Sequence, residues 1–202
     1  MKRTISILAA IVILFAFAVI PASAAETSCK VVKGDTLWKI ACKYKTGLNE
    51  IISCNPQITD PGLIYPGQIV NIPQKDSGAE NYEEEVIRLV NGIRAQYGLN
   101  ELKSNWELSR VARFKSQDMH DRRYFSHNSP TYGSPFDMMK SFGISYRSAG
   151  ENIACGYKTP QSVVDGWMNS SGHRANILNP SFTQIGVGFV ADGSYWTQMF
   201  TG

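Results

Sequence analysis

Histidine and acidic side chains are the groups in this chain best suited to acid–base or metal chemistry. Among the 202 residues are three histidines, of which His127 stands in the segment YFSH and His173 in GHR, while Glu151 stands in GENIACG. Two neutral imidazoles and one carboxylate can hold a divalent metal such as zinc with one position open, where a bound water becomes a nucleophile near neutral pH. Without a metal, a histidine beside Glu151 could act as a general base.

Spacing alone does not bring these groups together. His127 and His173 are far apart in the sequence and lack the i, i+4 spacing of a helical zinc motif. The structural alternative is that histidine caps a helix and that Glu151 ties loops together. His120 falls on an expected helix and is expected to face solvent. The GxSxG motif of serine hydrolases is absent from the sequence.

The elements that would position these residues belong to a module over residues 81–202. Apolar residues recur at helical spacing over residues 86–97, and Gly98 is expected to stop that helix. Ser104 and Glu107 form a capping-box pattern that opens a second helix. The expected buried residues of this second helix are Leu108, Val111, Ala112 and Met119.

Two further helices and a hairpin complete the larger module. Serine or threonine followed by proline predicts helices near residues 136–142 and 161–168. Alternating apolar residues over 185–189, an Asp-Gly turn and a strand over 195–201 predict a final antiparallel hairpin. Helices followed by a hairpin indicate an α+β fold built in layers.

A smaller unit over residues 28–74 precedes the polar linker expected at residues 75–80. It begins with a β run at Val31 and Val32, and Asp35 is expected to cap the first of two helices. The second helix is expected to stop before Asn55-Pro56, and residues 68–72 read as the returning strand. The expected order is therefore strand, helix, helix, strand.

Residues 1–25 have the pattern of a secretory signal peptide. Lys2 and Arg3 precede a long apolar run that ends in an A-x-A cleavage pattern, with cleavage expected after Ala24 or Ala25. The alternative is an uncleaved membrane anchor, since the run approaches the length that spans a bilayer. Cleavage leaves 18 basic and 17 acidic residues, a formal charge of +1. No basic face with interleaved aromatic residues remains, which argues against a nucleic-acid partner.

Export makes a disulfide bond plausible among the four cysteines, Cys29, Cys42, Cys54 and Cys155. Four cysteines allow three full pairings, and the sequence does not choose among them. One bridge within the small module, which holds three of the four, would add stability that its short core lacks. In the alternative reading, all four are free thiols that pack as small apolar side chains.

The segments KGDTLWKIACKY, NPQI and YPGQIVNIP of the small module resemble the LysM family. That resemblance implies binding of N-acetylglucosamine glycans such as peptidoglycan and chitin, in a groove between two turns. Backbone groups there would meet the sugar amide and hydroxyls, while Leu37 and Ile58 would cover its methyl group. The alternative is that these residues serve only as caps and core. The implied groove residues are Gly34, Asp35, Thr36, Leu37, Asn55, Pro56, Gln57 and Ile58.

The segments YFSHNSP, GENIACG, WMNSSGHRANIL and IGVGF of the larger module resemble the bacterial CAP superfamily, or SCP-like extracellular domains. The resemblance implies an α-β-α sandwich around a cavity lined by His127, Glu151 and His173. Many members place a second glutamate three residues after the tryptophan, where this chain has Ser170. Because serine cannot act as a carboxylate, the resemblance favours binding over metal-dependent catalysis.

Three functions follow, in order of preference. The first is a secreted protein that grips peptidoglycan or a chitin-type glycan and presents the larger module at the cell wall or spore envelope. The second is a hydrolase, dependent on metal or histidine, acting on wall or protein substrates. The third is a carrier of lipid or another small ligand. After signal cleavage no membrane contact is expected, and the oligomeric state is left open.

Overall fold

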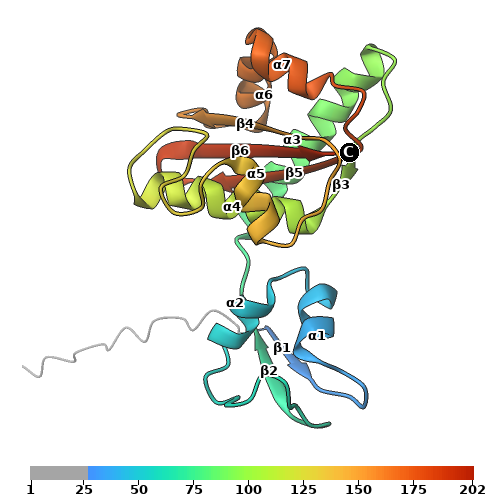
Figure 1. Ribbon diagram of the computed structural model, residues 1–202, viewed down its shortest axis with the longest axis vertical. Helices are drawn as coiled ribbons and strands as arrows, with labels where there is room; N and C mark the ends of the chain where they lie inside the picture. The colour runs from blue at the N-terminus through green and yellow to red at the C-terminus, as the bar shows by residue number, and fades with distance from the viewer. Residues whose placement is uncertain (1–26) are drawn as a thin grey trace, which may run out of the picture.

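The computed structural model describes residues 27–202, which form two modules (Figure 1). The predicted signal peptide, residues 1–25, lies outside the described residues. Within residues 27–202, no helix has both the length and the apolar character needed to cross a membrane.

The small module has the predicted order of strand, helix, helix, strand. Strands β1 (Thr27–Lys30) and β2 (Ile69–Ile72) pair antiparallel, and the connecting segment carries α1 (Leu37–Lys43) and α2 (Leu48–Ser53). β1 ends before the predicted Val31, whose amide nonetheless donates to the Gln68 carbonyl at 2.9 Å. The module has its own core, formed by Cys29, Val31, Leu37, Ile40, Ala41, Ile51, Ile58, Val70 and Ile72.

The cap of α1 differs from the prediction. Thr36 is the N-cap residue, and its Oγ1 accepts from the Lys39 amide at 3.1 Å. Asp35 instead closes the preceding turn, because its Oδ2 accepts from the Val32 amide at 2.9 Å. Both side chains can satisfy exposed amides, and the extended backbone of Thr36 decides which one caps the helix.

The larger module is an α+β sandwich around one sheet of order β3-β5-β6-β4. β3 is parallel to β5, and the other neighbours are antiparallel. A 3₁₀ turn, Asp192–Ser194, joins β5 to β6. The elements are α3 (Ser77–Gln96), β3 (Lys103–Ser104), α4 (Trp106–Asp121), α5 (Pro135–Ser141), β4 (Ala149–Cys155), α6 (Pro160–Asn169), α7 (Ser171–Ile177), β5 (Gln184–Val190) and β6 (Tyr195–Thr201).

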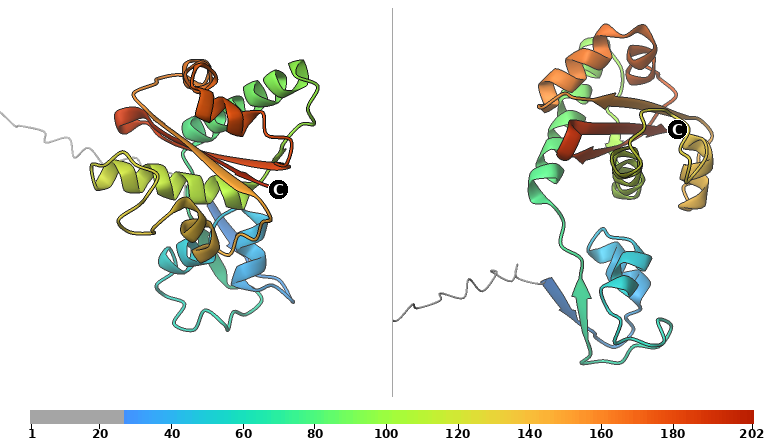
Figure 2. Two further views of the ribbon diagram at one scale, coloured as in Figure 1. Left: turned by 45° about the horizontal axis from the view of Figure 1, so that its top comes forward. Right: turned by 90° about the vertical axis from the view of Figure 1, so that its left-hand side faces the viewer.

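Helices cover both faces of this sheet (Figure 2). Apolar residues of α3 and α6 pack on one face against Val187 and Trp196, whereas apolar residues of α4 and α5 pack on the other against Met199. The α4 backbone lies directly on β5 at two glycines. A Cβ on Gly186 would lie 2.3 Å from the Leu108 carbonyl carbon, and one on Gly188 would lie 2.1 Å from the Arg113 nitrogen.

Two boundaries in the larger module differ from the sequence-based expectation. α3 begins at Ser77, inside the segment 75–80 expected to be a linker, because Asp76 Oδ1 accepts from the amides of Gly78 and Ala79. The cap of α4 is Asn105, whose Oδ1 accepts from the amides of Glu107 and Leu108. The predicted cap, Ser104, lies in β3 and pairs with Ile185.

The expected disulfide bond is not present in the structure. All four cysteines lie in the described part of the chain, and each is a free thiol. Cys29 is buried in the core of the small module, as the alternative reading predicts, whereas Cys54 and Cys155 are exposed.

Strand β4 lies at one edge of the sheet, and side chains from two helices cover its outer carbonyls. Trp167 Nε1 on α6 donates to the Ile153 carbonyl at 3.3 Å, and Asn176 Nδ2 on α7 donates to the Glu151 carbonyl at 3.1 Å. These bonds hold α6 and α7 against the strand that carries Glu151.

Candidate functional site

The structure brings His127 and Glu151 together. His127 Nδ1 lies 2.7 Å from Glu151 Oε1, between the loop after α4 and the edge strand β4. The Glu151 side chain is 2% exposed, whereas that of His127 is 53% exposed. When Glu151 is ionised its oxygens only accept, so Nδ1 carries the proton and the other ring nitrogen, Nε2, is left as a base. The pair therefore has the arrangement of a general base oriented by a carboxylate.

Burial shapes the electrostatics of this pair. Burial raises the pKa of Glu151, and the opposing effects of the His127 hydrogen bond and the Lys115 charge partly offset that rise. Glu151 Oε2 is buried and has no hydrogen-bond partner in the described structure. An unpaired buried carboxylate oxygen is costly and would accept a hydrogen bond from a ligand or water.

Two buried charged residues of α4 fix the loop that carries His127. Lys115 is fully buried, and its Nζ donates to the carbonyls of Ser126 and His127 at 2.8 and 2.7 Å. Asp118 accepts hydrogen bonds from the hydroxyls of Tyr124 and Ser129. Burial lowers the pKa of Lys115, while the Glu151 and Asp118 charges oppose that shift. These contacts set the loop conformation and so aim the imidazole at Glu151.

Lys115 is not among the site residues predicted from the sequence, although its position in the sequence carries a signal. Lys115 lies four residues after Val111 and four before Met119, so helical spacing places it in the apolar stripe of α4. A lysine on a buried helix face needs partners for its charge, and here the loop carbonyls supply them.

His173 lies on α7 and Ser170 caps the start of that helix, and neither side chain takes part in the His127–Glu151 hydrogen bond. Among the described residues, the His173 ring has no hydrogen-bond or ion-pair partner. Burial lowers the pKa of His173, and the nearby His127 charge lowers it further. Ser170 is the N-cap of α7, and its side chain makes no capping hydrogen bond.

The predicted metal ligands do not form a ligand set. Within residues 27–202, no three or more His, Cys, Asp or Glu side chains are grouped so as to hold a metal ion. His127 and Glu151 point at each other, and Ser170 supplies no carboxylate. Zinc binding by these residues therefore stays a prediction, and the chemistry derived below uses the side chains alone.

The first turn of the expected glycan groove is exposed but tied by its own hydrogen bonds. Gly34 has a φ of +92°, which favours glycine, and its carbonyl accepts from Lys39 Nζ at 2.7 Å. Asp35 and Thr36 bond to backbone amides of the same segment. The turn is therefore exposed to solvent, and its own hydrogen bonds hold its polar side chains in place.

Three residues of the expected groove belong to the framework of the small module. Leu37 and Ile58 are only 2% and 8% exposed and lie in one core cluster, and Ile58 also lines the cleft described next. Asn55 is buried, and its side chain bonds to the Ile51 and Asn71 carbonyls and to the Asn71 amide. Pro56 and Gln57 are exposed.

A cleft of about 410 Å³ lies in the loop after α2, on the side of the second expected turn. Leu63 and Tyr65 line it and are 52% and 60% exposed. Together with Ile58, which was predicted to contact the sugar, these two residues form the apolar part of the lining. The polar lining residues of the cleft are Gln57, Thr59, Asp60 and Gln68.

Comparison with protein families matches both modules. The model of the cysteine-rich secretory protein family, CAP, matches residues 87–201, and that of the LysM domain matches residues 29–73. The first match covers more than half of the chain, so the protein belongs to the CAP family, with a LysM domain before the CAP domain.

Individual relatives match one module or the other. The uncharacterized protein YkwD of Bacillus subtilis is 63% identical over 126 residues, 62% of this chain and 49% of YkwD. The spore coat assembly protein ExsA of Bacillus cereus is 47% identical over 43 residues, 21% of this chain and 7% of ExsA. The chain thus spans half or less of the length of either relative.

A solved structure of an extracellular SCP-domain protein from Bacillus anthracis also matches. It is 34% identical with a TM-score of 0.59, and the match covers 67% of this chain and 47% of that one. This similarity confirms the α+β sandwich.

Proposed function

We propose that this protein is exported, binds peptidoglycan or chitin-type glycan through its LysM domain, and thereby holds its CAP domain at the cell wall or spore envelope. The observation that carries the proposal is the cleft after α2, where exposed Leu63 and Tyr65 stand beside three neutral polar side chains and the carboxylate of Asp60. Apolar surface with a few polar groups suits the face and hydroxyls of an N-acetyl sugar. Tethering would raise the concentration of the CAP domain near wall ligands.

Binding of the full chain to protein-stripped peptidoglycan tests the LysM assignment. Tyr65→Ala is expected to weaken binding by about tenfold, the scale of a lost aromatic anchor. Tyr97→Ala is the matched control, because Tyr97 is 59% exposed and lies at the end of α3, away from the cleft. Equal binding by wild type and Tyr65→Ala would contradict the role of the cleft, and no binding by wild type would contradict the proposed function.

A hydrolase is the second candidate, and the 2.7 Å contact between His127 and Glu151 favours it. His127 Nε2 would take a proton from water as the water oxygen attacks a carbonyl carbon of the substrate. The protonated His127 would then return the proton to the leaving amine as the C–N bond breaks, which gives a carboxylic acid and an amine. Glu151 would stabilise the protonated imidazole during this step. The 53% exposure of His127 leaves room for a substrate from solvent.

Release of soluble fragments from peptidoglycan by wild type, His127→Ala and Glu151→Gln tests this candidate. Both substitutions are expected to lower the rate by about 100-fold or more, the usual contribution of a general base. His120→Ala is the control, since the His120 ring bonds to Asp121 and Asp192 and not to His127 or Glu151. The rate is also expected to fall in acid as Glu151 is protonated. Unchanged rates in both variants would exclude this pair as the catalytic site.

A further inference from the structure

A groove of about 900 Å³ lies between the two modules, apart from both sites described above. Figure 1 shows α1 and α2 of the small module facing α4 and α5 of the large one. The groove is lined from both sides, by Trp38 and Asn49 of the small module and by Tyr132 and Phe142 of the large one. Its volume is within the range of ligand sites, about 300–1,000 Å³.

Aromatic rings form much of the lining. Trp38 is 52% exposed and is not part of the core of its module. On the opposite side, the Phe142 ring lies 5.2 Å from Phe114 and 5.7 Å from Tyr132. The Arg110 guanidinium lies over the Phe114 and Phe142 rings at 5.3 and 5.2 Å, which fixes their positions. The groove therefore has rigid aromatic surface on one wall and an exposed indole on the other.

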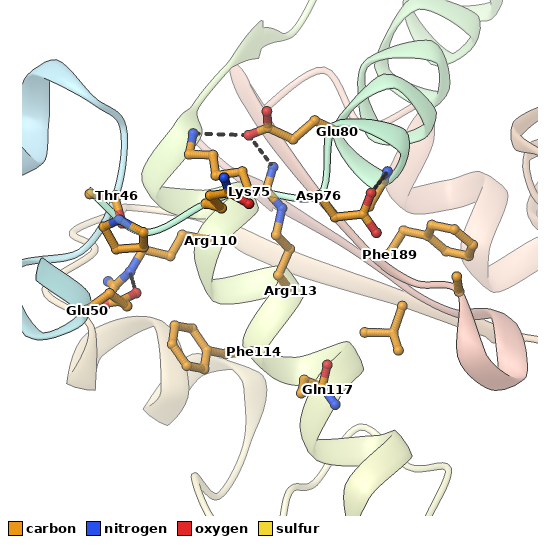
Figure 3. Close-up of a pocket in the computed structure, with 15 residues that line it drawn as sticks. Thr46, Glu50, Lys75, Asp76, Glu80, Arg110, Arg113, Phe114, Gln117 and Phe189 are labelled. Carbon is orange, nitrogen blue, oxygen red and sulfur yellow. Dashed lines mark hydrogen bonds and ion pairs between the residues drawn. The ribbon is translucent and has the colours of Figure 1, made fainter. Parts of the chain in front are cut away.

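The groove carries no unpaired charge in its lining. Its charged residues are Glu50 and Arg110, which bond to each other through two contacts of 2.5 and 2.8 Å. Figure 3 is a close-up of a second pocket that Glu50, Arg110 and Phe114 also line, and it shows this ion pair between the two modules. The other polar side chains of the lining are Asn49, Ser53, Cys54, Tyr132 and Ser141. Phosphate and other strongly charged ligands would find no free counter-charge here.

We propose that this groove is a second saccharide-binding site, which takes a neutral segment of the glycan gripped by the LysM cleft. The proposal rests on the proposed glycan binding and extends it. Sugar rings have apolar faces that stack on aromatic side chains and hydroxyls that bond to amides and hydroxyls, and the groove offers both. Because both modules line it, filling the groove holds the CAP domain in one orientation on the glycan.

Titration calorimetry of the full chain with tri-N-acetylchitotriose tests the second site directly. Wild type is expected to bind two molecules, and Trp38→Ala and Tyr65→Ala are each expected to bind one. Trp38 is exposed, so its substitution leaves the core of the small module intact. Tyr132→Ala approaches the groove from the other module and is expected to give the same loss as Trp38→Ala. Tyr97→Ala is expected to bind two.

Polymer binding gives a second readout. Two sites on one chain act together, so Trp38→Ala is expected to weaken retention on insoluble chitin or peptidoglycan by at least about tenfold. Retention by the groove is expected to change by less than about twofold between low and high salt, since its charges are paired.

The outcomes separate this inference from the proposed function. One bound molecule in wild type that is lost only in Tyr65→Ala overturns the second site and leaves the LysM assignment intact. No saccharide bound by wild type overturns both. Binding of an isolated stem peptide, without sugar, that depends on Trp38 would also overturn the inference, because the groove would then recognise peptide.

Discussion

His120 shows at the scale of one residue how a surface histidine can join two elements. It was expected to face solvent, but its Nδ1 lies 2.7 Å from Asp121 Oδ1 and its Nε2 lies 3.0 Å from Asp192 Oδ2. The first contact is within the end of α4, and the second connects α4 to the turn between β5 and β6. The bonds to Asp121 and then Asp192 raise the pKa of His120.

This contact predicts a pH-dependent stability. A raised pKa means that the folded state binds the proton more tightly, so the stabilisation is complete below the unfolded value of 6.5 and is lost as pH rises through the folded value. Asp192→Asn is therefore expected to lower the melting temperature at about pH 5.5 and to have little effect at about pH 8.5. Thermal melts at both pH values measure this. An equal effect at both would contradict a charged contact.

Asn55 was predicted to contact a sugar, and in the structure its buried side chain connects two elements of the small module. Its side chain joins the end of α2 to β2 through the Ile51 and Asn71 backbone. Asn55→Ala would leave these buried groups unpaired and is expected to destabilise the small module by about 2–4 kcal/mol. Chemical denaturation followed by fluorescence measures the loss. The exposed neighbour Gln57 is the control, and Gln57→Ala is expected to change stability by less than about 0.5 kcal/mol.

The candidate sites were predictable from the sequence to different degrees. Residue types and the family resemblance pointed to His127 and Glu151, which the structure places in contact. Leu37 and Ile58 were predicted to contact a sugar from the family resemblance, and the structure places both in the core, with Ile58 also at the cleft. Tyr65 was not predicted to line a binding cleft, because an exposed ring in a turn follows no sequence periodicity.

At the scale of elements, the close contact of α4 with β5 depends on two glycines in the segment IGVGF. A methyl group on Gly188 would meet the α4 backbone at 2.1 and 2.2 Å, and backbone cannot move aside as a side chain can. Gly188→Ala is therefore expected to destabilise the larger module by about 3 kcal/mol, within the range for overpacked cores.

Thermal unfolding with a matched glycine measures this effect. Gly172 lies in the first turn of α7, and a methyl group there would meet nothing within 4 Å. Gly172→Ala is expected to leave the melting temperature unchanged or slightly raised, because alanine favours helix over glycine. A similar loss in both variants would mean that the α4–β5 contact is not the cause.

The order and type of the main elements follow from the sequence, but several boundaries do not. Apolar periodicity predicted α3, α4 and the final hairpin because burial of one face dominates those segments. The helix starts were displaced where two capping residues are adjacent, as at Ser104 and Asn105. Pairing of Ser104 with Ile185 decides that case, and a contact between residues so distant in sequence leaves no local signal.

At the scale of the whole molecule, the Arg110–Glu50 ion pair connects the two modules. Arg110 and Glu50 are only 21% and 27% exposed, and the double contact is the strong form of such a pair. Glu50→Ala is expected to weaken the module contact by about 1 kcal/mol and to let the modules reorient. Small-angle scattering would then show a broader distance distribution.

The pair Glu85 and Arg88 provides the control for that experiment. Both residues lie within α3 and are exposed, so Glu85→Ala breaks an ion pair without touching the module contact. The scattering profile of Glu85→Ala is expected to equal that of wild type. An unchanged profile for Glu50→Ala as well would show that other contacts fix the orientation.

The covered edge of β4 bears on how copies of this protein behave when crowded together. An open edge strand is a template on which another chain can add its own strand, and repeated addition leads to aggregation. Here Trp167 and Asn176 already occupy the outward carbonyls of Ile153 and Glu151. The same side chains that steady the candidate site thus also protect the protein against edge-to-edge association when it is concentrated on a surface.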